Sequence, residues 1–494
     1  MRRSVFLSSL TLFLLAVCVW TEPVHAAPVF VKNDWRQIKP PPLHAIKPQR
    51  PTRLVLDNGI VLFLQQDKEL PLVTMNAVVR GGVKDEPFGK TGLADVFAES
   101  WRTGGTRTRT GDQLDDFLAM RAASIETNSD ATSISLSAHS LKKDFPDVLA
   151  VAVEVLREPE FRQEKIDLSK RQLLTAISRR NDESGEIAGR ESTKLAFGKD
   201  HPLARQPEYA TVAAISRDDL QLWHRRFVHS GNMLVGVTGD FEPEEMIALL
   251  KRHLGTLPTG QKVVLPEVGF VPTRPGLFFI GKNDINQSSI HLVQVGTTRK
   301  NPDHYAIEVM NEILGGGFWA RLFSNIRTKQ GLAYNVRGGV GLGWEHNAQY
   351  RITMGTKSQT TAKAITALFE QIQGMSMNPP TQDELQKAKD AILNSFVFKF
   401  DSKTKILDDQ MRLEFDGYPS EYTEKYAEQI QKITLDDVKR VAQKYLNPGG
   451  FAVLVVGNPD EIGNQLHQLK HLGPVQNIDI TIPPPPPRSS AASK

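Results

Sequence analysis

The chain has 494 residues, of which 40% are hydrophobic and 23% are charged, and its formal net charge is +4 at pH 7. So small a positive excess does not indicate binding to nucleic acid or to an anionic membrane. The length and the hydrophobic fraction predict two or more domains with buried cores. Beyond the N-terminal segment described next, no stretch is apolar enough for a transmembrane span.

Residues 1–26 have the pattern of a secretory signal peptide. Two arginines near the start precede an apolar run, and small residues follow up to Ala26. The run is too short to cross a bilayer. It contains Cys18, the only cysteine, so the mature protein is expected to have no disulfide and no thiolate metal site. These features predict an exported protein.

The elements of the first part of the chain are predicted from periodicity. An extended arm rich in proline and lysine occupies residues 27–50. In chain order we then expect strands within 53–67 and 72–82 with a turn at Asp57-Asn58-Gly59, helices over 90–101 and 111–123, a strand pair over 124–130 and 132–140, and helices over 144–157 and 163–182. Strands and helices mixed in blocks, with an antiparallel hairpin first, indicate an α+β fold.

The sequence contains an internal repeat of domain length, because residues 215–255 resemble residues 433–473 without a gap. The matched residues are Ile215, Asp218, Asp219, Gly239, His253, Leu254 and Gly255, which recur as Ile433, Asp436, Asp437, Gly457, His471, Leu472 and Gly473. Each copy also has a predicted helix N-cap followed by an acidic residue (Ser216 with Asp219, Thr434 with Asp437) and an apolar run predicted to be a buried strand (233–237, 451–456). So long a period indicates two copies of one domain.

The repeat sets the expected organisation of the chain. We expect an N-terminal domain over 51–256, a linker over 257–274, a C-terminal domain over 275–475 and a proline-rich, disordered tail over 476–494. The predicted fold is therefore two tandem, homologous α/β sandwich domains, each with an antiparallel-rich sheet packed against helices.

Several segments between residues 50 and 475 carry a family resemblance. They are LDNGIVLFLQQD, the GLA helix that ends in GGT, DHPLARQPEYATVAAISRDDL, LVGVTGD and NEILGGGFWARLFSNIRTKQGLAYNV. Because it contains all of these segments, the chain resembles the insulinase, pitrilysin and mitochondrial processing peptidase family of zinc metallopeptidases. The resemblance implies two homologous domains in a clamshell arrangement.

In active members of that family, a helix of the first copy carries His-x-x-Glu-His. Residues four apart share one helix face, so two imidazoles can bind one Zn²⁺, and the glutamate takes the proton of the metal-bound water. Aligned on GLA, these positions are Asp95, Ala98 and Glu99 here, and the family's third ligand, a glutamate, would be near Ala176. The resemblance therefore implies that this chain binds no catalytic zinc and that the metal belongs to a partner subunit.

Two pairs of residues four positions apart raise the question of another metal site. Asp95 and Glu99 share a helix face, but hard cations want six or more oxygen ligands. His467 and His471 are expected in the last turns of a closing helix, where cations suit the helix dipole, and no acidic residue is placed to complete a site. The simpler interpretation of Asp95 and Glu99 is a polar helix face that points into a wet cavity, and that of His467 and His471 is a helix end stabilised by the dipole.

The second copy keeps residue types that, in active members, face the zinc across a cavity. The glycine-rich segment Gly315-Gly316-Gly317 is followed by Arg327 and Tyr334, seven residues apart. As the resemblance implies, the glycines contact substrate, the tyrosine hydroxyl donates to the scissile carbonyl oxygen, and the arginine holds the substrate strand. Outside this family pattern, a triple glycine is more often the end of a helix, and such an Arg/Tyr spacing occurs by chance.

In some bacterial members of this family, one subunit carries the His-x-x-Glu-His motif and its partner carries the Arg/Tyr pair. Together with the asymmetry of the two copies and the signal peptide, the resemblance therefore implies an Arg/Tyr-supplying subunit of a heterodimeric zinc peptidase, secreted to the bacterial periplasm. Its expected partners are a homologous subunit with an intact zinc motif and an unfolded peptide substrate, with no nucleic acid and no membrane span. One alternative is a non-catalytic scaffold or peptide-binding subunit of the same family. Another is an autonomous peptidase with unconventional metal ligands. The first two both predict no zinc in the isolated chain.

Overall fold

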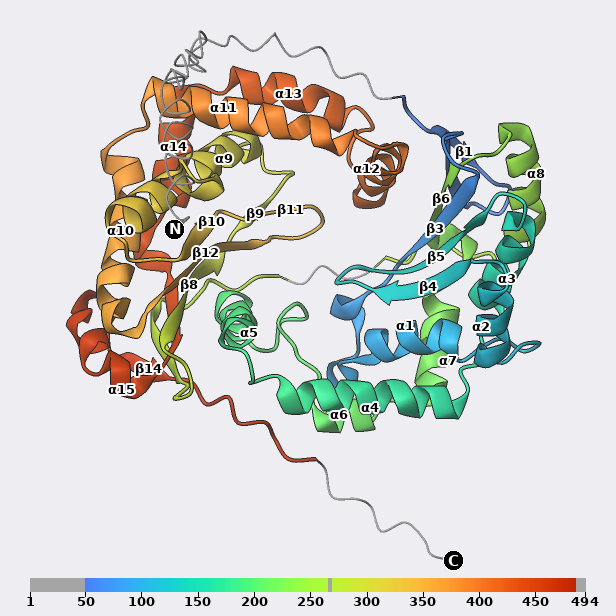
Figure 1. Ribbon diagram of the computed structural model, residues 1–494, viewed down its shortest axis with the longest axis horizontal. Coiled ribbons are helices and arrows are strands. Elements are labelled where there is room, and N and C mark those ends of the chain that lie inside the picture. The colour runs from blue at the N-terminus through green and yellow to red at the C-terminus, as the bar shows by residue number, and fades with distance from the viewer. Residues whose placement is uncertain (1–48, 265–268, 486–494) are drawn as a thin grey trace, which may run out of the picture. The chain divides into compact units, whose positions relative to one another are not determined.

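The structure, a computed structural model, describes residues 49–264 and 269–485 (Figure 1). The predicted signal peptide and almost all of the arm over 27–50 lie outside the described residues. So do residues 265–268 of the linker and residues 486–494 of the tail. Within the described ranges, no helix is long and apolar enough to span a membrane.

The first half contains a six-stranded sheet in the order β1-β2-β6-β3-β5-β4. Its strands are β1 (Thr52–Val55), β2 (Val61–Gln66), β3 (Leu72–Arg80), β4 (Ser124–Ser129), β5 (Ser133–Leu141) and β6 (Met233–Gly239). All neighbours are antiparallel except β2 and β6. The predicted turn joins β1 to β2, and Gly59 at its end has φ +94°, a conformation that favours glycine. The predicted strands of this half are confirmed.

Helices pack against this sheet and supply most of its hydrophobic core. They are α1 (Leu93–Thr103), α2 (Gly111–Ala119), α3 (Phe145–Arg157), α4 (Gln163–Arg179), α5 (Ser184–Phe197), α6 (Tyr209–Ala213), α7 (Arg217–Phe227) and α8 (Pro243–Leu254), with short 3-10 turns η2 (Val83–Asp85), η3 (Phe88–Lys90) and η4 (Ser230–Asn232). Phe97 and Trp101 of α1 and Phe161 are fully or almost fully buried, and the Phe97 ring packs at a tilt against the other two rings. The predicted helical periodicity around α1 is therefore that of a core helix.

The second half contains a sheet with the same pairing pattern, in the order β10-β12-β8-β13-β7-β14. Its strands are β7 (Gly276–Gly281), β8 (Gln287–Val295), β10 (Asn335–Gly339), β12 (Gln349–Lys357), β13 (Ala452–Gly457) and β14 (Val475–Asn477), beside a two-stranded ribbon of β9 (Thr297–Thr298) and β11 (Leu342–Gly343). The parallel pair β7–β13 corresponds to β2–β6 and is followed by three antiparallel neighbours, as in the first sheet. The topology confirms two tandem α+β domains. The sheets differ at one edge, where β14 is parallel to β7 but β1 is antiparallel to β2.

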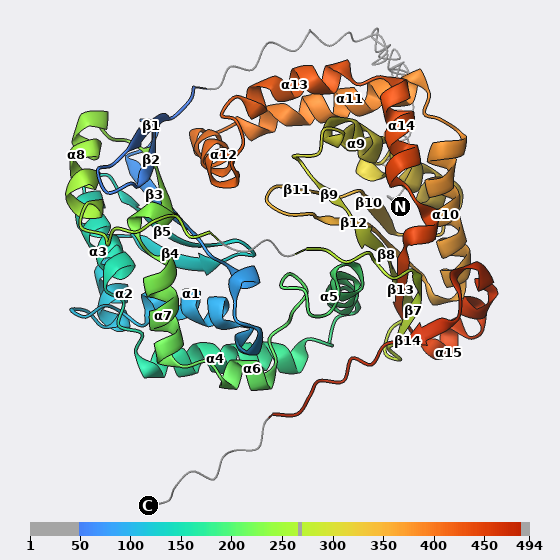
Figure 2. The ribbon, with the colours of Figure 1, turned by 180° about the vertical axis from the view of Figure 1, so that it is seen from behind.

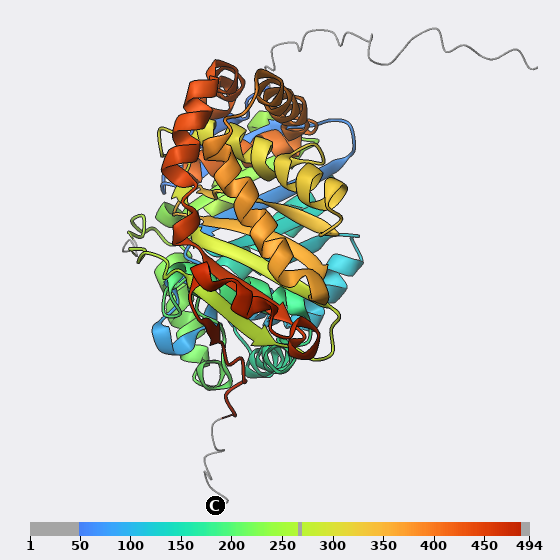
Figure 3. The same ribbon diagram turned by 90° about the vertical axis from the view of Figure 1, so that its left-hand side faces the viewer.

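The helices of the second half lie mainly on one face of this sheet; Figure 3 shows α10 crossing that face. They are α9 (His304–Asn311), α10 (Thr361–Met377), α11 (Gln382–Phe396), α12 (Lys403–Asp416), α13 (Tyr422–Lys432), α14 (Leu435–Tyr445) and α15 (Pro459–Ile462). Two π-helical segments, η5 (Glu312–Gly316) and η6 (Leu322–Lys329), follow α9, and the 3-10 turns are η7 (Ser358–Thr360), η8 (Val397–Lys399), η9 (Pro448–Gly450), η10 (Gln465–Gln468) and η11 (Lys470–Leu472).

The repeated N-caps are confirmed in both copies. The Ser216 hydroxyl accepts a hydrogen bond from the Asp219 amide at 3.3 Å, and the Asp219 carboxylate accepts one from the Ser216 amide at 2.8 Å. Thr434 and Asp437 make the same pair of bonds at 3.2 and 3.0 Å. Each pair satisfies donors that the first turn of a helix otherwise leaves free.

The end of the second copy differs from the sequence prediction. In place of one closing helix there is the single turn α15, ended by Gly463 at φ +54°, and then η10 and η11. His467 and His471 therefore do not share a helix face, and the His471 ring packs edge-on against Phe369 at 6.0 Å. The sheet also extends past residue 475, the predicted domain end, because β14 continues to Asn477. The left-handed glycine conformation explains the broken helix.

Each half sends one helix onto the sheet of the other half. α5, from the first half, contacts β8 and β13, whereas α12, from the second half, contacts β2 and β6. Figure 2 shows α5 beside the second sheet and α12 beside the first. In the first sheet, Gly236 leaves room for Met411 of α12. At the matching repeat position, Leu454 belongs to the same buried cluster as the small residues Ala188 and Ala196 of α5. The exchange links the two halves through apolar contacts on both sheets.

Candidate functional site

The helix with the degenerate zinc motif, α1, begins at a buried carboxylate. The Glu86 carboxylate accepts hydrogen bonds from the amides of Gly92, at 3.1 Å, and Ala94, at 2.7 Å. Gly92 has φ +102°, so a glycine is required at this helix start. Burial raises the pKa of Glu86 to about 7, although the amides and Arg205 favour the charged form. The start of α1 is therefore fixed by hydrogen bonds to a buried carboxyl group.

The four degenerate zinc-site positions do not form a ligand set. Asp95 is exposed and accepts a hydrogen bond from the Ser129 hydroxyl at 2.7 Å. Glu99 and Ala176 are exposed, on α1 and α4, while Ala98 is buried. Nowhere in the described ranges do three or more histidine, cysteine, aspartate or glutamate side chains gather as metal ligands.

The glycine-rich segment lies at the end of η5, against the edge strand β10. The backbone at Gly315 leaves helical geometry, with φ −148° and ψ 16°, and any Cβ there would collide with the Gly338 carbonyl oxygen of β10. A Cβ on Gly316 would collide with the Glu312 carboxylate. Gly317 is extended, and the nearest atom to its Cβ position is 3.4 Å away, in Trp319. Gly315 is thus required by packing against backbone, whereas Ala at Gly316 would need the Glu312 side chain to move and Ala at Gly317 would make an ordinary van der Waals contact.

Arg327 and Tyr334 lie together beside the same strand. The Arg327 guanidinium carbon is 5.3 Å from the centroid of the Tyr334 ring and 4.5 Å from that of Phe323. The Tyr334 side chain is 77% exposed, and its amide donates to the Gly355 carbonyl of β12 at 3.2 Å. Its hydroxyl makes no hydrogen bond within the part of the chain that the structure describes. A cation between two aromatic rings is oriented but still available to a ligand.

Sequence reasoning missed two features of this site. Phe323 was not singled out, although it lies four residues before Arg327 and therefore on the same side of its helical segment. The neighbouring Arg321, next to the buried Ala320, points elsewhere: it binds Glu384 through two hydrogen bonds of 2.6 and 2.8 Å. Of the two nearby arginines, Arg327 is therefore the one without a carboxylate partner.

The glycine-rich segment also borders a pocket of about 400 Å³. It is lined by residues of α9, η5, β10 and β12, among them Gly315, Gly316, Arg337, Arg351 and Thr353. Both η5 and η6 contact β10, so one edge strand organises the glycines, the Arg/Tyr pair and this pocket.

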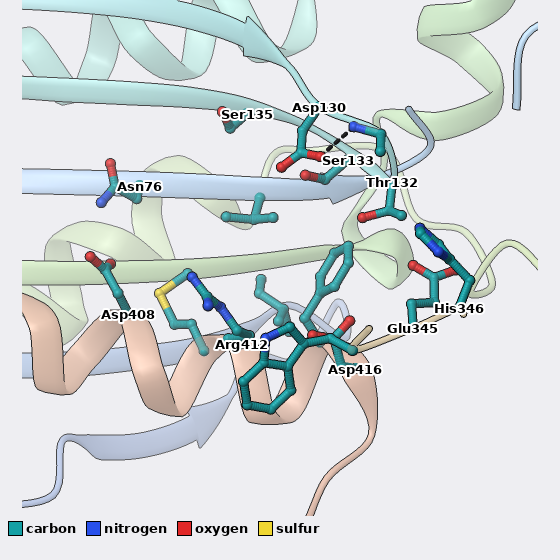
Figure 4. Close-up of a pocket in the computed structure, with 16 residues that line it drawn as sticks. Asn76, Asp130, Thr132, Ser133, Ser135, Glu345, His346, Asp408, Arg412 and Asp416 are labelled. Carbon is teal, nitrogen blue, oxygen red and sulfur yellow. Dashed lines mark hydrogen bonds between the residues drawn. The ribbon is translucent and has the colours of Figure 1, made fainter. Parts of the chain in front are cut away.

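Two larger cavities lie where the halves meet. One, of about 600 Å³, is bounded by the first sheet, by α12 and by the loop at Glu345; Figure 4 shows Asp408 and Asp416 on its α12 side and Asn76 and Ser135 on its sheet side. The other, of about 770 Å³, shares Glu345. Glu345 forms an ion pair with Lys84 at 3.2 Å across the two halves. Burial, and then the charge of Glu345, raise the pKa of Asp416 to about 6.

Comparison with known proteins identifies the family. Residues 61–206 match the family described as Insulinase (Peptidase family M16), and residues 214–392 match the one described as Peptidase M16 inactive domain. The chain belongs to the M16 family. The resemblance of its sequence is thereby confirmed, and so is its two-domain α+β fold.

Relatives within the M16 family carry different names. A Mycobacterium leprae protein named uncharacterized zinc protease is 26% identical over 81% of this chain and 91% of its own length. A Helicobacter pylori protein named non-peptidase homolog is 22% identical over 81% of this chain and 92% of its own length. A crystal structure titled peptidase M16 inactive domain, from Pseudomonas fluorescens, has a TM-score of 0.72 at 22% identity, over 83% of this chain and 98% of that one.

Within the M16 family, this chain is a member that lacks the zinc motif. Its first copy has an aspartate, an alanine and a glutamate at the motif positions, whereas its second copy keeps the glycine-rich segment and an accessible Arg/Tyr pair. The second copy thus presents a guanidinium and a phenol hydroxyl side by side, and the described ranges contain no group of three or more histidine, cysteine, aspartate or glutamate side chains that could hold a metal.

Proposed function

We propose that this chain is the subunit that supplies Arg327 and Tyr334 to a zinc peptidase formed with a second, zinc-binding M16 subunit. The observation that carries the proposal is the contact between these two side chains, with Tyr334 exposed. Neither side chain has a carboxylate or a hydrogen-bond partner in the described part of the chain. A packing role would favour a buried tyrosine, since the ring carries a large apolar surface.

The roles follow from the chemistry of the two side chains. The Tyr334 hydroxyl is a neutral donor, suited to the carbonyl oxygen of a scissile bond as negative charge develops on it. The Arg327 fork holds carbonyl oxygens of the substrate backbone, and its stacking between Phe323 and Tyr334 limits the directions in which it can point. The metal, held by the partner, would supply the activated water.

The substrate class that fits is an unfolded peptide, because the site lies along an edge strand and addresses backbone carbonyls. The signal-peptide pattern over residues 1–26 supports export, which in a bacterium with two membranes means the periplasm. Zinc is proposed as the cofactor of the partner and not of this chain.

The test is to purify the chain from its host with whatever M16 homologue co-elutes, and to measure zinc and peptide cleavage. In the assembled peptidase, Tyr334→Phe should lower kcat by about 10²–10³, the usual loss for one oxyanion donor. Tyr209→Phe is the matched control, since Tyr209 lies in α6 of the first half and its hydroxyl makes no hydrogen bond within the described residues. Undiminished cleavage by Tyr334→Phe would reject the proposal.

A second candidate is a non-catalytic scaffold or peptide-binding subunit. The loss of every zinc-motif residue favours it, as does the name non-peptidase homolog of the Helicobacter pylori relative. The same experiment separates the two: a scaffold tolerates Tyr334→Phe, whereas a shared active site does not.

A further inference from the structure

Arg337 and Arg351 stand side by side on one face of the second sheet. Arg337 of β10 pairs with Thr353 of β12, and Arg351 is two residues before Thr353, so both side chains leave the same face. The same face carries His291, the β8 partner of Thr353, whose ring contacts the Ser192 hydroxyl of α5 at 3.1 Å. Helix α5 covers this face over β8 and β13. The two arginines lie on the same face but on the neighbouring strands β10 and β12.

Neither arginine has a counterion. Both side chains are exposed, and within the described ranges neither makes a hydrogen bond or an ion pair. Two other arginines of this half are paired, Arg299 with Glu308 at 3.3 Å and Arg321 with Glu384 at 2.6 Å. Like charges on neighbouring positions of adjacent strands repel. The sheet thus holds two guanidinium groups together at a cost that an anion would relieve.

The two arginines line the pocket of about 400 Å³ beside the glycine-rich segment. Gly315, Gly316, Gly338 and Gly339 also line it, so part of its wall is bare backbone. Thr353 adds a hydroxyl that makes no hydrogen bond in the described part of the chain. The pocket therefore combines two cationic forks with a neutral donor and little side-chain bulk.

Two carboxyl groups border the same pocket without cancelling this charge. Glu308 is paired with Arg299. Glu312 packs against Gly316, and burial together with the charge of Glu308 raises its pKa, which favours the neutral acid. Arg337 and Arg351 are thus left as the unpaired charges of the pocket.

We propose that this pocket binds a carboxylate of the peptide substrate, held by Arg337 and Arg351. The proposal rests on the proposed function and names a substrate class for the same site. A guanidinium fork matches the two oxygens of a carboxylate, and two forks give a charge-assisted site of defined direction. The carboxylate is either an aspartate or glutamate side chain or the C-terminus of the peptide.

The spacing along β10 predicts where that carboxylate lies in the substrate. β10 begins directly after Tyr334, and Arg337 is three residues further along the chain. Strands rise about 3.3 Å per residue, so Arg337 is about 10 Å from Tyr334 along the strand direction. An extended peptide has the same rise. The carboxylate should therefore belong to the residue about three positions from the scissile bond.

The test begins with binding to the isolated full chain, measured by fluorescence anisotropy with labelled, otherwise neutral peptides. The peptides carry glutamate or glutamine at one position, and a free or amidated C-terminus. A peptide with a carboxylate should bind about tenfold or more tightly than its neutral counterpart. The pair of peptides that shows the preference, Glu against Gln or free against amidated C-terminus, identifies which carboxylate the pocket binds.

The double variant Arg337→Gln/Arg351→Gln should lose this preference and keep the affinity for neutral peptides. Arg171→Gln is the control, because Arg171 is an exposed arginine of α4 with no side-chain partner in the described ranges. Equal affinity of wild type for acidic and neutral peptides would overturn the proposal. So would an equal loss for both peptides in the double variant, or loss of the preference in Arg171→Gln.

The outcomes for the pocket and for the proposed function are separable. If the isolated chain prefers carboxylates but no assembly cleaves peptides, the pocket stands and the shared active site fails. If the assembled peptidase cleaves with no preference for a carboxylate about three residues from the scissile bond, the pocket fails and the shared active site stands.

Discussion

Gly236 of β6 lies directly beneath Met411 of α12, so close that a Cβ on Gly236 would overlap the Met411 sulfur. This contact allows a helix from the second half to pack on the first sheet, together with Leu407 and Phe415 of the same helix. The two halves are therefore joined by a close steric fit in addition to the linker. The first prediction tests this fit.

Gly236→Ala should destabilise the protein by about 1–3 kcal/mol, the usual cost of inserting a methyl group into a packed core. The loss should be accompanied by faster amide hydrogen exchange in α12, measured by mass spectrometry. Gly374→Ala in α10 is the control, since no atom lies within 4 Å of its Cβ position. Unchanged exchange in α12 would mean that the helix is held by other contacts.

Much of this fold was predictable because its signals are local. The hairpin turn at Gly59, the two N-caps and the buried strands β6 and β13 each depend on a few neighbouring residues, and the structure has them where the sequence predicts them. The internal repeat predicted two copies of one topology. The repeat did not predict the break of the closing helix at Gly463, or that β14 is parallel to β7 where β1 is antiparallel to β2.

The exchange of α5 and α12 and the arrangement of the site were not predictable in the same way. Helical periodicity shows that a helix has an apolar face but not which sheet that face covers. The contact between Arg327 and Tyr334 depends on the path of the chain from η6 to β10, which no local pattern revealed. Arg337 and Arg351 are brought together only by the register of β10 and β12.

The glycine-rich segment makes a second prediction, because its glycines differ in their surroundings. Gly315→Ala should destabilise the protein by about 1–3 kcal/mol, since the new Cβ meets the backbone of Gly338, which cannot move without disturbing β10. Gly317→Ala should change stability by less than about 0.5 kcal/mol, as its nearest neighbour is 3.4 Å away. Urea denaturation of both variants measures the difference. Equal effects would contradict the packing described for η5.

Glu86 makes a third prediction, on stability at rising pH. Folding raises its pKa from 4.5 to about 7, so the native state retains a proton that the unfolded chain has already released. Its contribution is full below about pH 4.5 and is lost as the pH rises through 7, by about 3 kcal/mol in all. Glu86→Gln, a neutral isostere, should remove this dependence. Chemical denaturation of both proteins between pH 5 and 8 checks it, and parallel curves would show that Glu86 is ionised in the fold.

His291 makes a fourth prediction, with the opposite sign. Burial under α5, and then the charge of Arg351, lower its pKa to about 4. Its contribution to stability is therefore present above the unfolded pKa of about 6.5 and is lost as the pH falls towards 4. His291→Gln should be less sensitive to acid than wild type over that range. Hydrogen exchange in α5 localises the effect, and no difference in α5 between the two proteins would place the acid-sensitive group elsewhere.

The stacking of Arg327 makes the last prediction, for the assembled peptidase. Arg327→Lys keeps the charge but loses the planar fork that lies over Phe323 and Tyr334. Hydrogen bonds to a charged group contribute about 1.5–3 kcal/mol, so kcat/KM should fall about tenfold or more. Stability should fall by no more than about 1 kcal/mol, the usual contribution of an exposed cation–π contact, because Arg327 makes no ion pair within the described residues. Lys329→Gln, which removes a positive charge from the same segment, is the control. If Arg327→Lys retained full kcat/KM, Arg327 would act only through its charge, and the orienting role assigned to its fork would be wrong.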